Sequence, residues 1–135
     1  MKKLIFLIAL IFTFVAVNAQ GYGNFTKWGT AADTLVASAT KTAEFTIVSE
    51  YASKVSLCLF TDAISGTPAY TAVLYKKLTG FEYVSTGDTI RHSGGGDKTA
   101  FFTVFDLTAN TYKVAITATG GAQKSRLYLN GLYRR

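Results

Sequence analysis

The sequence predicts an all-β protein, an antiparallel β-sandwich of jelly-roll or immunoglobulin-like type with about eight strands after an N-terminal signal helix. After residue 19, no segment shows a sustained 3.6-residue apolar stripe. Short alternating segments recur instead between turn signals, and glycine, threonine and aromatic residues are plentiful while proline occurs only at Pro68. A closed barrel is the alternative architecture.

The predicted strands follow one another without a helical connection. In the segment 42–49, Ala43, Phe45 and Ile47 share one face of the expected strand. The segment 54–61 is apolar on both faces, which is typical of a central strand. A hairpin is expected around Gly80, where glycine can adopt a positive φ. In chain order the strands are expected at 33–38, 42–49, 54–61, 69–76, 81–85, 89–92, 99–105, 112–119 and 126–132, with turns or loops at 62–68, 86–88, 93–97 and 119–122.

Residues 1–19 have the pattern of a secretory signal peptide. Lys2 and Lys3 give a positive start, residues 4–17 are uncharged and mostly apolar, and small residues precede the expected cleavage before Gln20. The alternative is an uncleaved membrane anchor, although the run is shorter than the ~20 apolar residues of a typical span. We expect an exported protein located outside the cell or on its surface. It would comprise the signal at 1–19, an extended aromatic arm at 20–32 and a β-sandwich domain at 33–135, and would contact a membrane only if the signal stays attached.

Charge and cysteine content exclude some classes of function. The formal net charge is +6, but the basic residues are dispersed and two of them lie in the signal. Nucleic-acid binding normally requires a basic stripe with stacking aromatics, so we do not expect it. Cys58 is the only cysteine, so the domain must be stabilised by its apolar core and not by an internal disulfide. Because Cys58 lies between two leucines, we expect it to be a buried small hydrophobe.

No residue pattern predicts catalysis, a metal site or a cofactor. His92 is the only histidine, and the adjacent Ser93 would point to the opposite face of a strand, so a Ser–His pair is not expected there. Zinc requires several Cys or His ligands, and calcium requires clustered oxygens that no Asp-x-Asp spacing supplies here. Most aspartates fall near expected turns, where they bond to the backbone. We therefore expect a protein that is not an enzyme.

The aromatic residues are the strongest pointer to binding. Tyr22, Phe25 and Trp28 lie in the predicted N-terminal arm among glycines and are the candidates for a protein interface. Exposed tyrosines could alternatively form a stacking platform for sugars. Tyr70 and Tyr75 have opposite parity on one predicted strand, however, so they should face opposite sides of the sheet.

Several segments resemble small signal-bearing β-sandwich proteins of Bacteroidota and their phages. The signal ends in Asn-Ala-Gln, as in many exported Bacteroidota proteins. Asp62-Ala-Ile-Ser-Gly-Thr-Pro-Ala leads into Ala72-Val-Leu-Tyr-Lys-Lys-Leu-Thr-Gly-Phe-Glu-Tyr-Val84, with Thr79-Gly80 where the pattern usually has Asp-Gly. Ala31-Ala-Asp-Thr-Leu35 and the segment from Tyr112 to Gly120 also fit. The resemblance implies a virion or surface component, and it marks Thr34 and Thr89 as O-glycosylation candidates because each follows an aspartate and precedes an apolar residue.

These inferences together predict a non-catalytic structural or interaction protein. It would be a β-sandwich subunit of a phage virion or of a bacterial extracellular or surface assembly, with other protein subunits as partners. A secreted carbohydrate-binding module, with glycans as partners, is the alternative.

Overall fold

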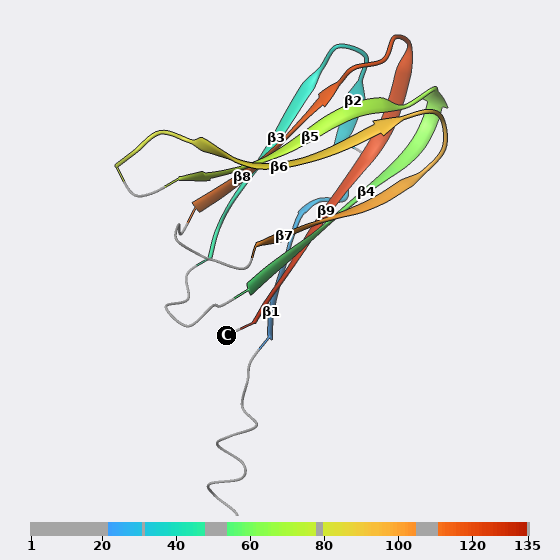
Figure 1. The fold of residues 1–135 in the computed structure, drawn as a ribbon. Coiled ribbons are helices and arrows are strands. Elements are labelled where there is room, and N and C mark those ends of the chain that lie inside the picture. The colour runs from blue at the N-terminus through green and yellow to red at the C-terminus, as the bar shows by residue number, and fades with distance from the viewer. Residues whose placement is uncertain (1–21, 31, 48–53, 78–79, 105–110, 135) are drawn as a thin grey trace, which may run out of the picture.

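The computed structural model describes residues 22–134 except 31, 48–53, 78–79 and 105–110 (Figure 1). The signal segment 1–19 and Gln20 lie outside the described residues. Within them there are nine strands and no helix: β1 (Tyr22–Trp28), β2 (Thr34–Val36), β3 (Thr40–Thr46), β4 (Lys54–Gly66), β5 (Ala69–Lys77), β6 (Val84–Ser93), β7 (Lys98–Val104), β8 (Thr111–Ala118) and β9 (Gln123–Arg134). No helix among the described residues could cross a membrane.

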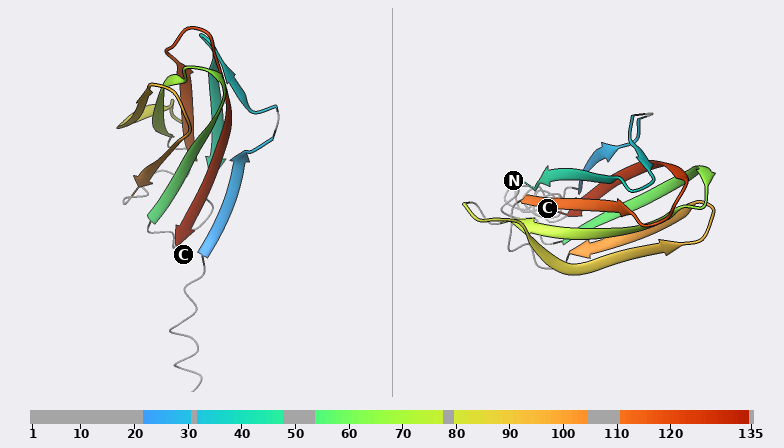
Figure 2. Two further views of the ribbon diagram at one scale, coloured as in Figure 1. Left: turned by 90° about the vertical axis from the view of Figure 1, so that its right-hand side faces the viewer. Right: turned by 90° about the horizontal axis from the view of Figure 1, so that it is seen from above.

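The strands form two antiparallel sheets packed face to face, which confirms the predicted β-sandwich (Figures 1 and 2). The five-stranded sheet has the order β1-β9-β4-β7, and β2 pairs with β9 on the same side as β1. The four-stranded sheet has the order β3-β8-β5-β6. Six of the eight connections between the described strands cross from one sheet to the other, and with these two strand orders this is the topology of a jelly roll. Of the two predicted types, the structure therefore shows the jelly roll.

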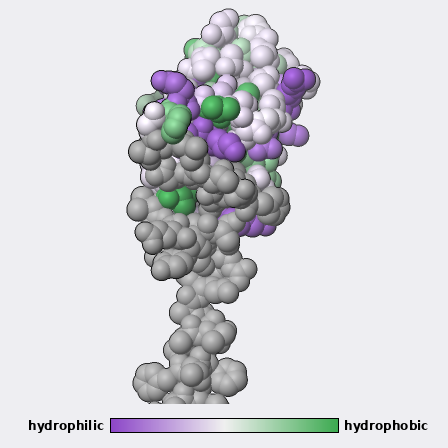
Figure 3. All heavy atoms as spheres, turned by 60° about the vertical axis from the view of Figure 1, so that its left-hand side comes forward, coloured by the Kyte–Doolittle hydropathy of each residue, from purple (hydrophilic) through white to green (hydrophobic). Residues whose placement is uncertain are grey.

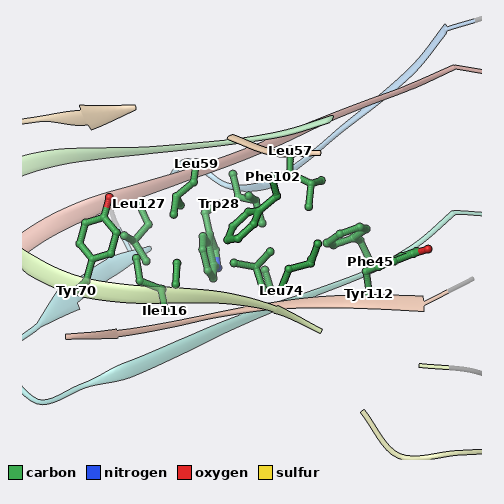
Figure 4. Close-up of a cluster of buried hydrophobic side chains, with 14 of the residues drawn as sticks. Trp28, Phe45, Leu57, Leu59, Tyr70, Leu74, Phe102, Tyr112, Ile116 and Leu127 are labelled. Carbon is green, nitrogen blue, oxygen red and sulfur yellow. The ribbon is translucent and has the colours of Figure 1, made fainter. Parts of the chain in front are cut away.

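The core lies between the sheets and is built by the alternation along each strand (Figure 4). In β4, Val55, Leu57 and Leu59 are fully buried, whereas the residues between them are partly exposed. Leu74 of β5 and Ile116 of β8 approach from the other sheet. Burying a leucine or isoleucine side chain contributes about 1.5–3 kcal/mol, so this layer supplies the stability that disulfides provide in many small exported domains.

An aromatic stack closes one end of the core. The rings of Phe25 and Phe45 have centroids 4.8 Å apart, and Phe45 stacks in turn on Tyr112 at 5.7 Å. Phe25 pairs with Gly131 in the β1–β9 ladder. A Cβ at position 131 would come within 2.1 Å of the Phe25 ring. Glycine is therefore required there, because the Phe25 ring occupies the space of the missing side chain.

At the opposite end, a buried glutamine joins the two sheets. Gln123, the first residue of β9, accepts a bond from the Ala69 amide at 2.7 Å and donates to the Ala69 carbonyl at 2.8 Å. Gly66 has a φ of +74°, and a Cβ there would overlap the Ala122 carbonyl. The β4–β5 and β8–β9 turns are thus in close contact, and the two hydrogen bonds from the Gln123 side chain fix the start of β5.

Three predicted segments differ from the observed ones. The arm 20–32 contains a strand, β1, because its backbone pairs with β9 of the same chain. The expected turn at 86–88 is a bulge inside β6, in which Thr86 donates its hydroxyl to the Leu74 carbonyl at 3.1 Å. The expected loop at 62–68 begins only after β4 has continued through a second bulge to Gly66. In each case a polar or glycine-rich segment stays in the sheet because long-range pairing satisfies its backbone groups.

Candidate interaction surface

The outer face of the five-stranded sheet brings together residues from four strands. In one row, Thr26 of β1, Asn130 of β9, Cys58 of β4 and Phe101 of β7 are consecutive cross-strand neighbours. The next row contains Asn24, Leu132, Ser56 and Thr103. Thr26 donates its hydroxyl to the Asn130 side chain at 2.8 Å, which fixes that edge of the face.

Between these rows lies an open hollow of about 290 Å³. Two large apolar side chains border this hollow and are exposed to solvent: Phe101 is 65% and Leu132 is 51% exposed. The residues that line the hollow are uncharged and come from β1, β4, β7 and β9: Asn24, Ser56, Cys58, Phe101, Asn130 and Leu132. Exposed aromatics on an otherwise uncharged surface are typical of protein contact sites.

Cys58 belongs to this hollow and is partly exposed. The sequence-based expectation that it is a buried hydrophobe is therefore wrong. The reason is parity: Leu57 and Leu59 on either side point into the core, so Cys58 must point outward. In a strand whose two faces are both apolar, composition alone does not say which set of residues is inside.

The outer face of the four-stranded sheet has a different character. The ammonium group of Lys113 lies 4.0 Å from the centroid of the Tyr83 ring and 5.1 Å from that of Tyr75. The ammonium group of Lys77 lies 5.2 Å from the centroid of the same Tyr83 ring. Desolvation and a hydrogen bond with Glu44 raise the pKa of Tyr83. Among the coloured residues on the side of the molecule in Figure 3, hydrophobic and hydrophilic side chains lie in small separate groups.

Tyr75 and Tyr70 lie on opposite faces of β5, as their parity predicts. Tyr75 is on the outer face, whereas Tyr70 is 1% exposed and its hydroxyl lies 3.2 Å from that of Thr61 in the facing sheet (Figure 4). Burial raises the pKa of the Tyr70 phenol. Of these two tyrosines, only Tyr75 is available to a ligand.

The predicted interface residues of the N-terminal arm take a different role. Trp28 is 6% exposed and lies in the middle of the core cluster (Figure 4). Phe25 is part of the aromatic stack with Phe45. Tyr22 begins β1 and pairs with Arg134 in the ladder. Trp28 and Phe25 thus pack within their own chain, and their role at an interface stays a prediction. Alternation along β1 turns Phe25 inward, and the bulge between Thr26 and Trp28 shifts the alternation so that Trp28 points inward as well.

The two glycosylation candidates lie on strands. Thr89 is exposed on β6, which is the last strand of the four-stranded sheet among the described residues and pairs there with β5. Thr34 is partly buried on β2, where it pairs with Arg126. Thr89 is therefore the more accessible of the two hydroxyls.

The structure places the candidate chemical groups apart from one another. His92 packs on Tyr70 with ring centroids 5.3 Å apart. Asp97 accepts a bond from the Ala63 amide, and the Asp88 carboxylate lies 3.0 Å from the Thr86 hydroxyl oxygen. Among the described residues, no three His, Cys, Asp or Glu side chains gather closely enough to hold a metal ion.

Sequence reasoning missed Phe101 and Leu132. A signal was present in the sequence, since Phe101 and Phe102 are adjacent on a predicted strand and two neighbouring residues of a strand point to opposite faces. Phe102 is 2% exposed, so Phe101 must face solvent.

Comparisons with known proteins identify the fold of this chain and no family. No protein-family model matches the sequence, and no curated protein matches it. Dimeric latent PorU from Porphyromonas gingivalis is similar over 85% of this chain with a TM-score of 0.52 and 8% identity, and the match covers only 13% of that chain. A Bacillus endospore appendage structure, from a family of disulfide-linked pili, matches over 86% of this chain and 90% of that one, with 17% identity and a TM-score of 0.47. A family 16 carbohydrate-binding module matches over 71% and 73% of the two chains, with 10% identity and a TM-score of 0.43. These identities show shared fold alone.

Proposed function

We propose that this protein is a non-catalytic structural or interaction protein, an exported β-sandwich subunit of a phage virion or of a bacterial extracellular or surface assembly. The observation that carries the proposal is the uncharged hollow on the outer face of the five-stranded sheet, with Phe101 and Leu132 exposed beside it. Transferring such side chains out of water contributes roughly 25 cal/mol per Å² of apolar area, which favours contact with another protein surface.

The experiment is fractionation of the exported chain from the cells or phage that produce it. We expect the protein to sediment with virions, filaments or envelope fragments, and to leave them only under conditions that dissociate the particles. A chain recovered solely as free protein in the soluble fraction would contradict the proposal.

Carbohydrate binding remains the second candidate, and the Tyr75–Tyr83–Lys113 cluster favours it. Tyrosine rings can stack on sugars, and lysine ammonium groups can pair with acidic ones. A glycan array that includes acidic polysaccharides tests this candidate. Specific signals lost in Tyr83→Ala but kept in Phe101→Ala would support it, and an array without signals would exclude it.

A further inference from the structure

We infer that the outer face of the five-stranded sheet pairs with the same face of a second copy of this chain, as a two-fold dimer in which each Phe101 enters the partner's hollow. The inference rests on the proposed function and names a partner for that surface. It follows from three properties of the face: its shape, its charge pattern and its size.

The shape is self-complementary. Phe101 projects from β7 immediately beside the hollow whose floor contains Cys58, because Phe101 and Cys58 are direct cross-strand neighbours. A projection and a recess on one surface are what a two-fold interface requires, since each copy then both inserts and receives. An apolar cavity of ~150 Å³ is large enough for benzene. A hollow of about 290 Å³ can therefore accept a phenyl ring.

The charge pattern permits this pairing. The centre of the face is uncharged, so two copies of a basic chain can approach there without repulsion. The charged residues of β4 that point outward lie at the two ends of the face, Lys54 at one end and Asp62 at the other, away from Cys58 at its centre.

The size of the face suits a weak, specific contact. Four strands about 4.8 Å apart and the length of β4 from Lys54 to Asp62 span roughly 500 Å². Two such faces bury on the order of 1,000 Å², which is near the lower limit for a specific interface. The dimer is non-covalent, because facing sheets lie ~10 Å apart and a disulfide needs Cα atoms about 4.4–6.8 Å apart.

The test is sedimentation velocity of the purified chain over a micromolar concentration series, with two arginine variants. Phe101→Arg places a charge at the centre of the contact, and we expect it to raise the dimer Kd by about 30-fold or more. Phe81→Arg is the matched control, because Phe81 is 67% exposed but lies outside the hollow. It should dimerise like the wild type. Both substitutions are at exposed positions, and circular dichroism should confirm an unchanged fold.

Cys58 provides a second readout that is independent of hydrodynamics. In the wild type and in Phe81→Arg, reaction of the thiol with Ellman's reagent should slow as protein concentration rises, because the partner covers the hollow. In Phe101→Arg the rate should be independent of concentration.

A wild-type chain that stays monomeric through the series, or a Phe101→Arg chain that dimerises as tightly as wild type, overturns the two-fold pairing. Neither result bears on the proposed function, which is tested by fractionation with particles. A chain that dimerises through Phe101 but never accompanies a particle would support the pairing and contradict the proposed assembly role.

Discussion

The two edge strands of the five-stranded sheet, β1 and β7, both carry aromatic residues but use them in opposite ways. β1 turns Phe25 and Trp28 into the core and presents Asn24 and Thr26 to solvent. β7 buries Phe102 and leaves Phe101 exposed. The difference shows that aromatic content does not mark a binding surface by itself. What matters is the direction in which each residue points once its strand is paired, which depends on alternation and on bulges such as the one between Thr26 and Trp28.

The largest effect should separate the two phenylalanines of β7. Phe102→Ala removes a ring that is 2% exposed, and we expect the free energy of unfolding to fall by about 3–5 kcal/mol. Phe101→Ala removes a ring that faces solvent and should change stability by no more than about 0.5 kcal/mol while weakening association. Urea denaturation measures both. Equal losses of unfolding free energy in the two variants would contradict the assignment of Phe102 to the core and Phe101 to the surface.

The next effect tests how β1 is held. Gly131→Ala would place a Cβ inside the Phe25 ring, so the ring must leave the stack with Phe45. We expect a loss of about 1–3 kcal/mol in the free energy of unfolding, as for other overpacked sites. Gly121→Ala is the control, because nothing lies within 4 Å of a Cβ there. A Gly131→Ala protein as stable as the control would show that Phe25 does not anchor β1.

A smaller effect is expected on the four-stranded sheet, whose outer face carries charged residues, unlike the uncharged hollow. Lys113→Met keeps the length of the side chain but removes its charge from the rings of Tyr75 and Tyr83. Stability should fall by about 0.5–1 kcal/mol, the value of an exposed cation–π contact. The dimer Kd should not change. Thermal unfolding measures the stability, and sedimentation velocity measures the dimer Kd. A weakened dimer would show that the outer face of the four-stranded sheet takes part in the dimer contact.

The smallest effect concerns the turn that joins β1 to β2. The Asp33 carboxylate accepts bonds from the Thr30 amide at 2.9 Å, the Thr30 hydroxyl at 2.7 Å and the Gly29 amide at 3.0 Å. Bonds from the Thr30 backbone and hydroxyl are the main reason that the pKa of Asp33 is below its ordinary value. A carboxyl with a lowered folded pKa stabilises the fold above its unfolded pKa, and this contribution disappears as pH falls through the folded value.

Because Asp33 is partly exposed and solvent screens its charge, Asp33→Asn should lower the free energy of unfolding by only about 0.5 kcal/mol at neutral pH. The difference between variant and wild type should vanish in acid below the folded pKa. Melting temperatures measured across the acid range provide the test. A difference that persists unchanged in acid would show that the carboxylate charge does not act in this turn.

The sequence alone determined the fold class and most of the strands. Alternation along 42–49, 54–61 and 69–76 is a local property of the chain, and it identifies strands because one face of each must be buried. The same local rule separated Tyr70 from Tyr75 correctly.

Only the tertiary structure decided the rest, because it depends on which strands pair. Backbone pairing with β9 turns the supposed arm into β1 and directs Trp28 inward. Pairing of β6 with β5 turns the expected break at Thr86 into a bulge, and the Thr86 hydroxyl bonds to the Leu74 carbonyl there. The hollow combines Asn24, Cys58, Phe101 and Leu132 from four strands that are distant in sequence. No local pattern contains that combination, since a surface made by long-range pairing exists only when the sheet is assembled.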